Sequence, residues 1–212
     1  MYREDGMLFI IMEYLPGQTL ELVWKNLAEH EKVEILAKLR VILNQMHSLP
    51  SPGFYGSISK GSVPYDFFWA PGGSQAIRGP FNDETAFNMA VINKSRWNSG
   101  YNNTSPFRTD FHEKHLLQIL DGHHPTFSHS DVQRKNIIVY QRSSQESETG
   151  KEWEVSLVDW ASAGWYPDHW EYVASYFAFV WDDDWPSRVD DFLEPHPVEA
   201  AIMHVITQEL WF

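Results

Sequence analysis

Two apolar segments separated by a polar stretch constrain the fold more than any other feature of the chain. Residues 137–140 (IIVY) have the character of a buried strand, and residues 153–160 alternate apolar side chains as a returning strand would. The polar stretch 141–151 suits a surface turn, because the entropy of loop closure grows slowly with length. The pattern predicts a β-hairpin that brings the residues before its first strand next to those at the end of its second.

Oxygen-bearing side chains gather at the predicted end of this hairpin. Asp131 precedes the first strand, Asn136 follows five positions later, and Asp159 stands at the tip of the second strand. Phosphoryl transfer needs such a set, in which one carboxylate orients the acceptor hydroxyl and takes its proton. An amide oxygen and a second carboxylate suit Mg²⁺, which takes hard oxygen ligands.

These residues carry a family resemblance. Residues 127–139 (FSHSDVQRKNIIV) resemble the catalytic loop of the aminoglycoside phosphotransferase and choline-kinase-like family, and residues 158–167 (VDWASAGWYP) resemble its metal-binding segment, most of all in fungal members. The resemblance implies a protein-kinase-like fold and an ATP-dependent kinase. In it Asp131 is the catalytic base, Asn136 and Asp159 are the Mg²⁺ ligands, and His129 braces the loop.

The loop departs from the family pattern at two positions. Ser130 stands where the family usually has glycine, and Gln133 stands where a histidine is common. A serine hinders a tight turn if this site needs a positive φ. Neither departure removes a chemical group that the mechanism requires.

Residues 8–17 (LFIIMEYLPG) resemble the strand and hinge that join the two lobes of a kinase. The resemblance implies that the backbone C=O of Glu13 and N–H of Leu15 pair with the adenine of ATP, with Met12 behind the base. The alternative is an ordinary strand followed by a turn. Either interpretation makes residues 7–14 a buried strand.

A complete kinase of this family has a phosphate-covering loop, a strand lysine and a helix glutamate before its hinge. Only residues 1–6 precede the strand in this sequence. Activity of the chain as given is therefore in doubt, and three explanations stay open: a truncated form, a catalytically inactive remnant or binding module, or a smaller lobe supplied in trans by a partner chain.

An acidic, aromatic segment is the candidate acceptor site. Asp182, Asp183, Asp184 and Trp185 could hold an amine through charge and cation–π attraction. The alternative is a solvated helix start, where aspartate is favoured. The acceptor expected from the family is a small-molecule hydroxyl, and the acidic composition favours a cationic one.

Composition excludes several classes of function. The 212 residues carry a formal net charge of −13, which repels phosphate backbones and argues against nucleic-acid binding. The apolar runs are too short to cross a membrane. The chain has no cysteine and starts with no signal peptide, which favours a reducing compartment and a cytoplasmic location.

The expected fold is α+β and mainly helical, resembling the C-terminal lobe of a protein kinase, with a small catalytic hairpin and a residual hinge strand. It forms a single domain over residues 1–212. We expect a strand and hinge (1–17), helices (18–50), a loop-rich and helical substrate region (51–125), the catalytic and metal loops (126–160) and C-terminal helices (161–212). In the helix predicted for residues 29–48, an apolar stripe should face the core: Val33, Leu36, Leu39, Leu43 and Met46.

Histidines offer a weaker pattern. His123 and His124, together with His129, could indicate a metal cluster. Bracing of the loop, or simple exposure, explains these residues equally well.

Overall fold

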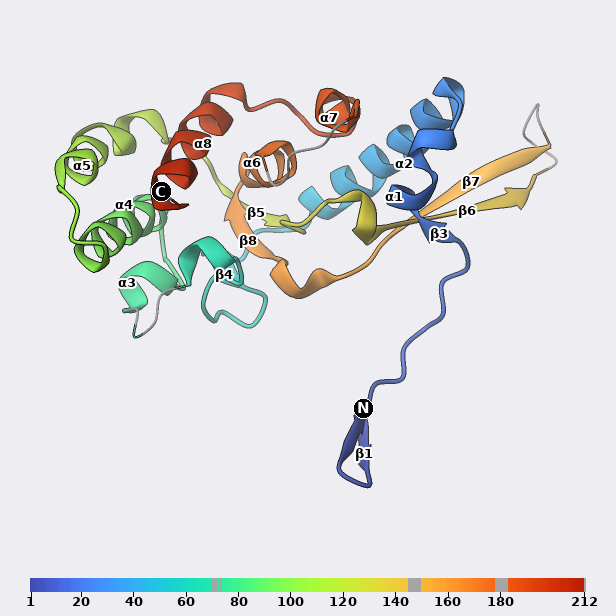
Figure 1. The fold of residues 1–212 in the computed structure, drawn as a ribbon, viewed down its shortest axis with the longest axis horizontal. Coiled ribbons are helices and arrows are strands. Elements are labelled where there is room, and N and C mark those ends of the chain that lie inside the picture. The colour runs from blue at the N-terminus through green and yellow to red at the C-terminus, as the bar shows by residue number, and fades with distance from the viewer. Residues whose placement is uncertain (70–71, 73, 145–149, 178–182, 212) are drawn as a thin grey trace.

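The computed structural model describes residues 1–69, 72, 74–144, 150–177 and 183–211. It confirms the α+β class, with helices packed around small antiparallel sheets (Figure 1). The helices are α1 (Leu20–Val23), α2 (Glu29–His47), α3 (Gln75–Arg78), α4 (Glu84–Tyr101), α5 (Phe107–Ile119), α6 (Trp170–Phe177), α7 (Val189–Phe192) and α8 (Pro197–Trp211). The strands are β1 (Tyr2–Glu4), β2 (Met7–Phe9), β3 (Gln18–Thr19), β4 (Gly56–Ser57), β5 (Pro125–Ser128), β6 (Ile137–Ser143), β7 (Lys151–Leu157) and β8 (Gly164–Pro167).

The predicted hairpin is the antiparallel pair β6–β7, whose register runs from Ile137 opposite Leu157 to Ser143 opposite Lys151. The strands extend into the polar stretch that was expected to be turn, and residues 145–149 at its tip lie outside the described residues. Strand β3 pairs with the start of β6 and completes one sheet. A second sheet has the order β4–β8–β5.

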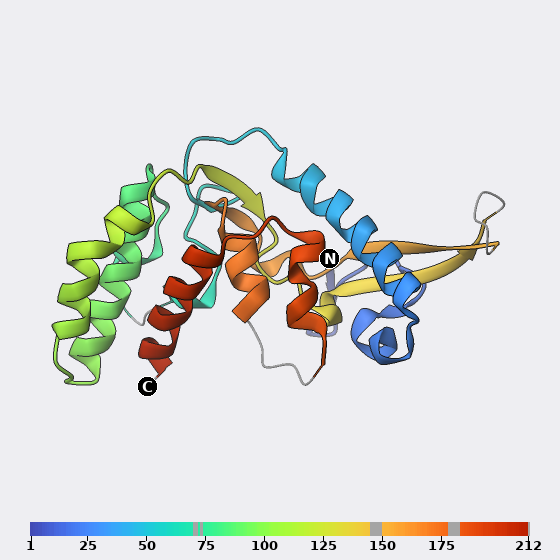
Figure 2. The same ribbon diagram turned by 90° about the horizontal axis from the view of Figure 1, so that it is seen from above.

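Helix α2 lies across the β6–β7 ribbon, while α4 and α5 pack together at the opposite end of the body (Figure 2). On α2, the side chains of four residues are buried, as their spacing predicts: Leu36, Leu39, Leu43 and Met46. At the edge of the interface, the Lys38 ammonium lies 2.5 Å from Glu152 on β7. The apolar stripe therefore seats α2 on the strand that leads to Asp159.

The prediction that Val33 faces the core is wrong, because 52 % of its surface is exposed. Ile35, fully buried, takes the first core position instead. Successive helical residues turn by about 100°, so the buried stripe is centred near Leu36 and Leu39 and Val33 lies about 110° away from that centre. The spacing from Val33 to Leu36 fits the helical period, but this period alone does not show where the buried face is centred.

An aromatic cluster forms the core beneath the second sheet. The ring of Trp170 stacks on Tyr166 at 5.3 Å and meets Phe87 edge-on at 5.5 Å. Phe68 also packs against Phe87 and Trp170. These contacts join α4, β8 and the start of α6, so α6 begins from a fixed position.

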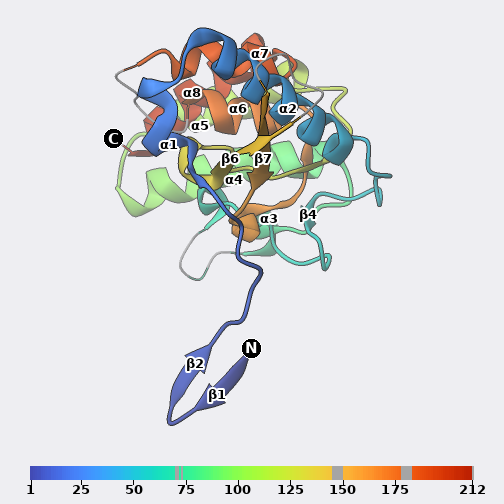
Figure 3. The ribbon, with the colours of Figure 1, turned by 90° about the vertical axis from the view of Figure 1, so that its right-hand side faces the viewer.

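The first seventeen residues form an arm that projects from the body (Figure 3). The prediction of a buried strand over residues 7–14 is wrong: β2 covers only Met7–Phe9, pairs with β1, and is mostly exposed. An apolar run is buried only if another element covers it, and none does so among the described residues. The arm joins the body at Gly17, where φ is 116° and a Cβ would collide with the Val139 carbonyl.

The remaining helices match the predicted positions with different bounds. Helices α4 and α5 lie within residues 51–125, and α6, α7 and α8 lie within residues 161–212. Residues 178–182 of the expected C-terminal helical region lie outside the described residues. Within the described ranges, no helix combines the length and apolar character needed to cross a bilayer.

Truncation of the α2 stripe should separate core from surface positions. Leu39→Ala removes a fully buried side chain and should lower the free energy of unfolding by about 2–5 kcal/mol. The matched change Val33→Ala should alter it by no more than about 0.5 kcal/mol, because Val33 is exposed. Urea unfolding measures both; equal losses would contradict the assigned face of α2.

Candidate functional site

The loop between β5 and β6 folds back on itself around the Asp131 carboxylate. The Asn136 amide nitrogen donates to Asp131 Oδ2 at 2.7 Å and to the Asp131 carbonyl at 3.0 Å. The Gln133 side-chain amide donates to Asp131 Oδ1. The loop closes in the 3-10 turn Arg134–Asn136, so the spacing of five residues becomes a direct contact between the carboxylate and the amide.

Asp159 reaches the same place from the other strand. The Val158 N–H donates to the Asn136 carbonyl at 3.0 Å, which continues the ladder of Ile137 and Leu157 by one bond. Asp159 follows in the left-handed region, with φ 64° and ψ 67°, and its residue is exposed. Within the described part of the chain its carboxylate has no ion pair or hydrogen bond. Asp131, Asn136 and Asp159 thus lie at one end of the ribbon.

His129 connects the two loops. Its Nε2 lies 3.0 Å from the Val158 carbonyl, and its Nδ1 accepts a 3.3 Å hydrogen bond from the Asp131 N–H. The ring is fully buried and packs against Trp160 at 4.7 Å. Because Nδ1 is an acceptor, Nε2 carries the ring proton and donates the hydrogen bond to the Val158 carbonyl. This geometry is that of a brace, the role that the sequence suggested.

Glu171 is a site residue that sequence reasoning missed. Its carboxylate is 1 % exposed and accepts the backbone N–H of His129 at 2.5 Å and that of Ser130 at 2.8 Å. A buried carboxylate is stable only when its oxygens are hydrogen-bonded. The signal available was an acidic residue inside the aromatic run that forms α6.

Arg134 is a second residue that was missed. Its buried guanidinium lies beside the contacting rings of Trp24, at 5.8 Å, and Trp185, at 5.6 Å, and pairs with Asp183 at 2.7 Å. Arginine suits such a position, because its planar, weakly hydrated cation stacks on aromatic faces. The loop after Asp131 is therefore tied to the segment that follows residue 182.

This arrangement changes the interpretation of the acidic segment. Asp183 is neutralised by Arg134, and Asp184 accepts hydrogen bonds from the Trp24 indole at 2.7 Å and from Lys32 at 2.9 Å. Trp185 is buried. Cations of the chain already occupy these carboxylates, so Asp183, Asp184 and Trp185 brace the loop instead of facing a ligand. Asp182 lies outside the described residues.

Ser130 has a positive φ, the condition under which a serine hinders the turn. Its φ is 64°, a conformation that non-glycine residues adopt at a cost of about 1–2 kcal/mol. Asp159 has the same φ of 64°. Strain at both positions flanking the cluster is typical of functional loops that the surrounding structure holds in place.

The donor set at the end of the ribbon fits a hard divalent cation. Because the Asn136 amide nitrogen is committed to Asp131, its oxygen faces away as an acceptor. Asp159 contributes an exposed carboxylate without an ion pair in the described residues. Oxygen donors of this kind are the ligands that Mg²⁺ takes.

The expected hinge belongs to the projecting arm, and no element among the described residues covers it. Met12 is 75 % exposed, Glu13 is exposed and Leu15 is half-buried. Their backbone groups have no partner among the described residues, so they stay open to one. The arm enters β3 at Gln18, and Thr19 is paired with Ile138, two residues after Asn136. In the described part of the chain, therefore, no wall lies behind an adenine at Met12, and the pairing at Glu13 and Leu15 stays a prediction.

A comparison with models of known protein families found no match, and a comparison with curated proteins found none either.

Relief of strain at the loop is testable. Ser130→Gly should raise the free energy of unfolding by up to about 1 kcal/mol, because glycine adopts φ 64° without a Cβ clash. Ser128→Gly, on buried β5 where φ is not positive, should lower it by about 1 kcal/mol. Chemical denaturation of the two variants checks the sign; a loss from Ser130→Gly would contradict the strained conformation.

Proposed function

We propose that this chain is a phosphotransferase of the aminoglycoside phosphotransferase and choline-kinase-like type, which transfers the γ-phosphoryl group of ATP to a small-molecule hydroxyl. The observation that supports it most directly is the contact between Asp131 and Asn136 at the end of the β6–β7 ribbon, with Asp159 one residue beyond a backbone bond to Asn136. This is the set of groups that phosphoryl transfer requires.

In the proposed reaction Asp131 accepts the proton of the acceptor hydroxyl as the oxygen bonds to phosphorus and the bond to the ADP oxygen breaks. Gln133 and Asn136 each hold one oxygen of the Asp131 carboxylate, which fixes its plane and leaves lone pairs for the hydroxyl. His129 and Glu171 hold the backbone from which Asp131 projects. Positioning of this kind supplies much of the rate of phosphoryl transfer.

Asn136 and Asp159 would hold Mg²⁺, which supplies charge neutralisation for the phosphates. Lys135 adds a cation nearby, with its ammonium 3.9 Å from Asp131 Oδ2. The exposed position of Asp159 leaves its carboxylate accessible to a bound nucleotide. The acceptor class is a hydroxyl compound that carries an amine, which the formal charge of −13 favours.

A non-catalytic binding module is the second candidate, and the exposed arm favours it. Seven apolar side chains of the arm are more than half exposed: Met1, Met7, Leu8, Ile10, Ile11, Met12 and Tyr14. Apolar surface of this extent on an extended segment is typical of a segment that pairs with another chain. In this alternative the arm binds a partner and the Asp131 loop performs no chemistry.

Nucleotide binding and transfer should respond differently to the two aspartates. We expect millimolar ATP with Mg²⁺ to raise the melting temperature of the wild-type protein, because a ligand that binds only the folded state stabilises it. Asp159→Ala should weaken the magnesium dependence of that shift. Asp131→Ala should leave the shift intact and lower ADP release with an amino-sugar or amino-alcohol acceptor by about 10²–10⁴-fold.

Asp121→Asn, at an exposed aspartate away from the loop, is the matched control and should behave as wild type. Folding of each variant is checked by circular dichroism. Absence of a magnesium-dependent ATP shift in the folded wild-type protein would reject the enzyme and favour the binding module. Equal loss of nucleotide binding from both aspartate variants would reject the assigned roles.

A further inference from the structure

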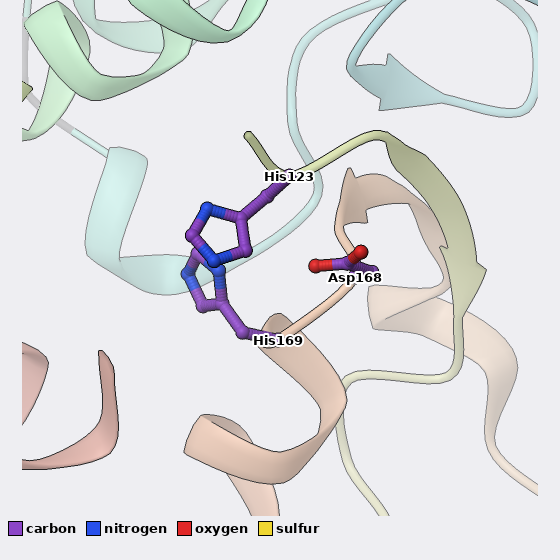
Figure 4. Close-up of side chains that lie close together, drawn as sticks. All are labelled: His123, Asp168 and His169. Carbon is purple, nitrogen blue, oxygen red and sulfur yellow. The ribbon is translucent and has the colours of Figure 1, made fainter. Parts of the chain in front are cut away.

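A cluster of histidines and carboxylates lies at the other end of β5 from Asp131. His123 comes from the loop before β5, Asp168 and His169 from the loop before α6, and His196 and Glu199 from the start of α8. Two groups that share His123 have ligand atoms within 4.8 Å of one another: His123 with Asp168 and His169, and His123 with His196 and Glu199. Figure 4 shows the first group, in which the rings of His123 and His169 meet edge to face at 4.4 Å.

Glu84, at the start of α4, orients His123. Its carboxylate accepts the backbone N–H groups of Gly122 and His123 and lies 2.9 Å from His123 Nδ1. The Tyr55 hydroxyl donates to the His123 carbonyl at 2.7 Å. A carboxylate on one ring nitrogen fixes the tautomer and leaves the other nitrogen as a metal ligand.

That other nitrogen faces a carboxylate at the separation of a ligand pair. His123 Nε2 lies 3.4 Å from Glu199 Oε1, longer than a strong N–H···O hydrogen bond. Two ligands bound to one tetrahedral Zn²⁺ at about 2 Å lie about 3.3 Å apart. The distance therefore suits two groups that share an ion.

The second side of the cluster holds buried polar atoms without a partner. His169 is 1 % exposed, and its Nδ1 has no hydrogen-bond partner among the described residues; the same holds for the buried Oδ1 of Asp168. An imidazole nitrogen and a carboxylate oxygen are both of the kinds that bind transition metals.

The charge of the cluster points the same way. Within the described residues, the ion pairs of Glu84, Asp168 and Glu199 are all with histidines, and no lysine or arginine neutralises them. Half-buried carboxylates that lie this close together favour a bound cation.

We propose that this cluster binds one zinc-class transition-metal ion, with His123 as the ligand common to both groups. Imidazole nitrogens mixed with carboxylates favour Zn²⁺, Co²⁺ or Ni²⁺ over Mg²⁺. The ion would tie the loop before β5 to the start of α6 in the first group, or to the start of α8 in the second. This proposal does not depend on the function assigned to the Asp131 loop.

Metal titration of the full chain, stripped with EDTA, tests the site. Zn²⁺ should bind with one-to-one stoichiometry by calorimetry and raise the melting temperature, and Co²⁺ should give the visible absorption of a tetrahedral ion. His123→Ala should abolish the calorimetric Zn²⁺ binding, the rise in melting temperature and the Co²⁺ absorption. Glu84→Gln, which removes only the group that orients His123, should weaken Zn²⁺ binding by about 10–100-fold. Glu199→Gln and His169→Ala show which group holds the ion, and at least one should weaken binding more than 10-fold.

His30→Ala removes an exposed histidine on α2 and should bind Zn²⁺ as the wild type does. If His123→Ala fails to fold, Glu199→Gln and Glu84→Gln decide, since both keep the shape of the side chain. Absence of stoichiometric Zn²⁺ binding by the wild-type protein would overturn the site and leave His123 as a side chain held between Glu84 and Glu199. Binding unaffected in both folded glutamine variants would overturn it equally.

Discussion

The candidate site depends on one buried carboxylate. Glu171 receives the backbone N–H groups of His129 and Ser130, and through them it fixes the turn from which Asp131 projects. A carboxylate removed from water needs such donors, because an unpaired buried charge is costly by several kcal/mol. Glu171 also follows Trp170, which is held in the aromatic core. The position of the Asp131 loop is thereby set by the core.

A buried cation completes the support from the other side. Arg134, held by Asp183 and the rings of Trp24 and Trp185, fixes the end of the loop as Glu171 fixes its beginning. Asp131 lies between these two attachments, and its own carboxylate is held by Gln133 and Asn136. Electrostatic attachments of opposite sign at the two ends of a short loop favour a preorganised site, in which little reorganisation is needed when charge develops.

Features encoded locally could be predicted from the sequence, and features that depend on distant partners could not. The β6–β7 hairpin and the convergence of Asp131, Asn136 and Asp159 follow from strand patterns and short spacings. The role of Glu171 depends on a partner more than forty residues away. The prediction of a buried strand in the arm was wrong because burial needs another element to cover the strand. The apolar run itself does not specify that element. Asp183 and Asp184 were candidates for an acceptor site or a solvated helix start. Their pairing with Arg134 and Lys32 could not be predicted, because tertiary packing alone sets it.

The two proposed sites share elements but not chemistry. Strand β5 runs from the histidine cluster to His129, and the start of α6 carries both His169 and Glu171. An ion at His169 would hold the same helical turn whose carboxylate supports the Asp131 loop, so metal bound at the cluster would stabilise the loop without touching it. The loop offers only oxygen donors, whereas the cluster offers imidazole nitrogens, and these select different cations. Either site can therefore be lost while the other is kept, and an effect of Zn²⁺ on the Asp131 loop would have to pass through β5 or α6.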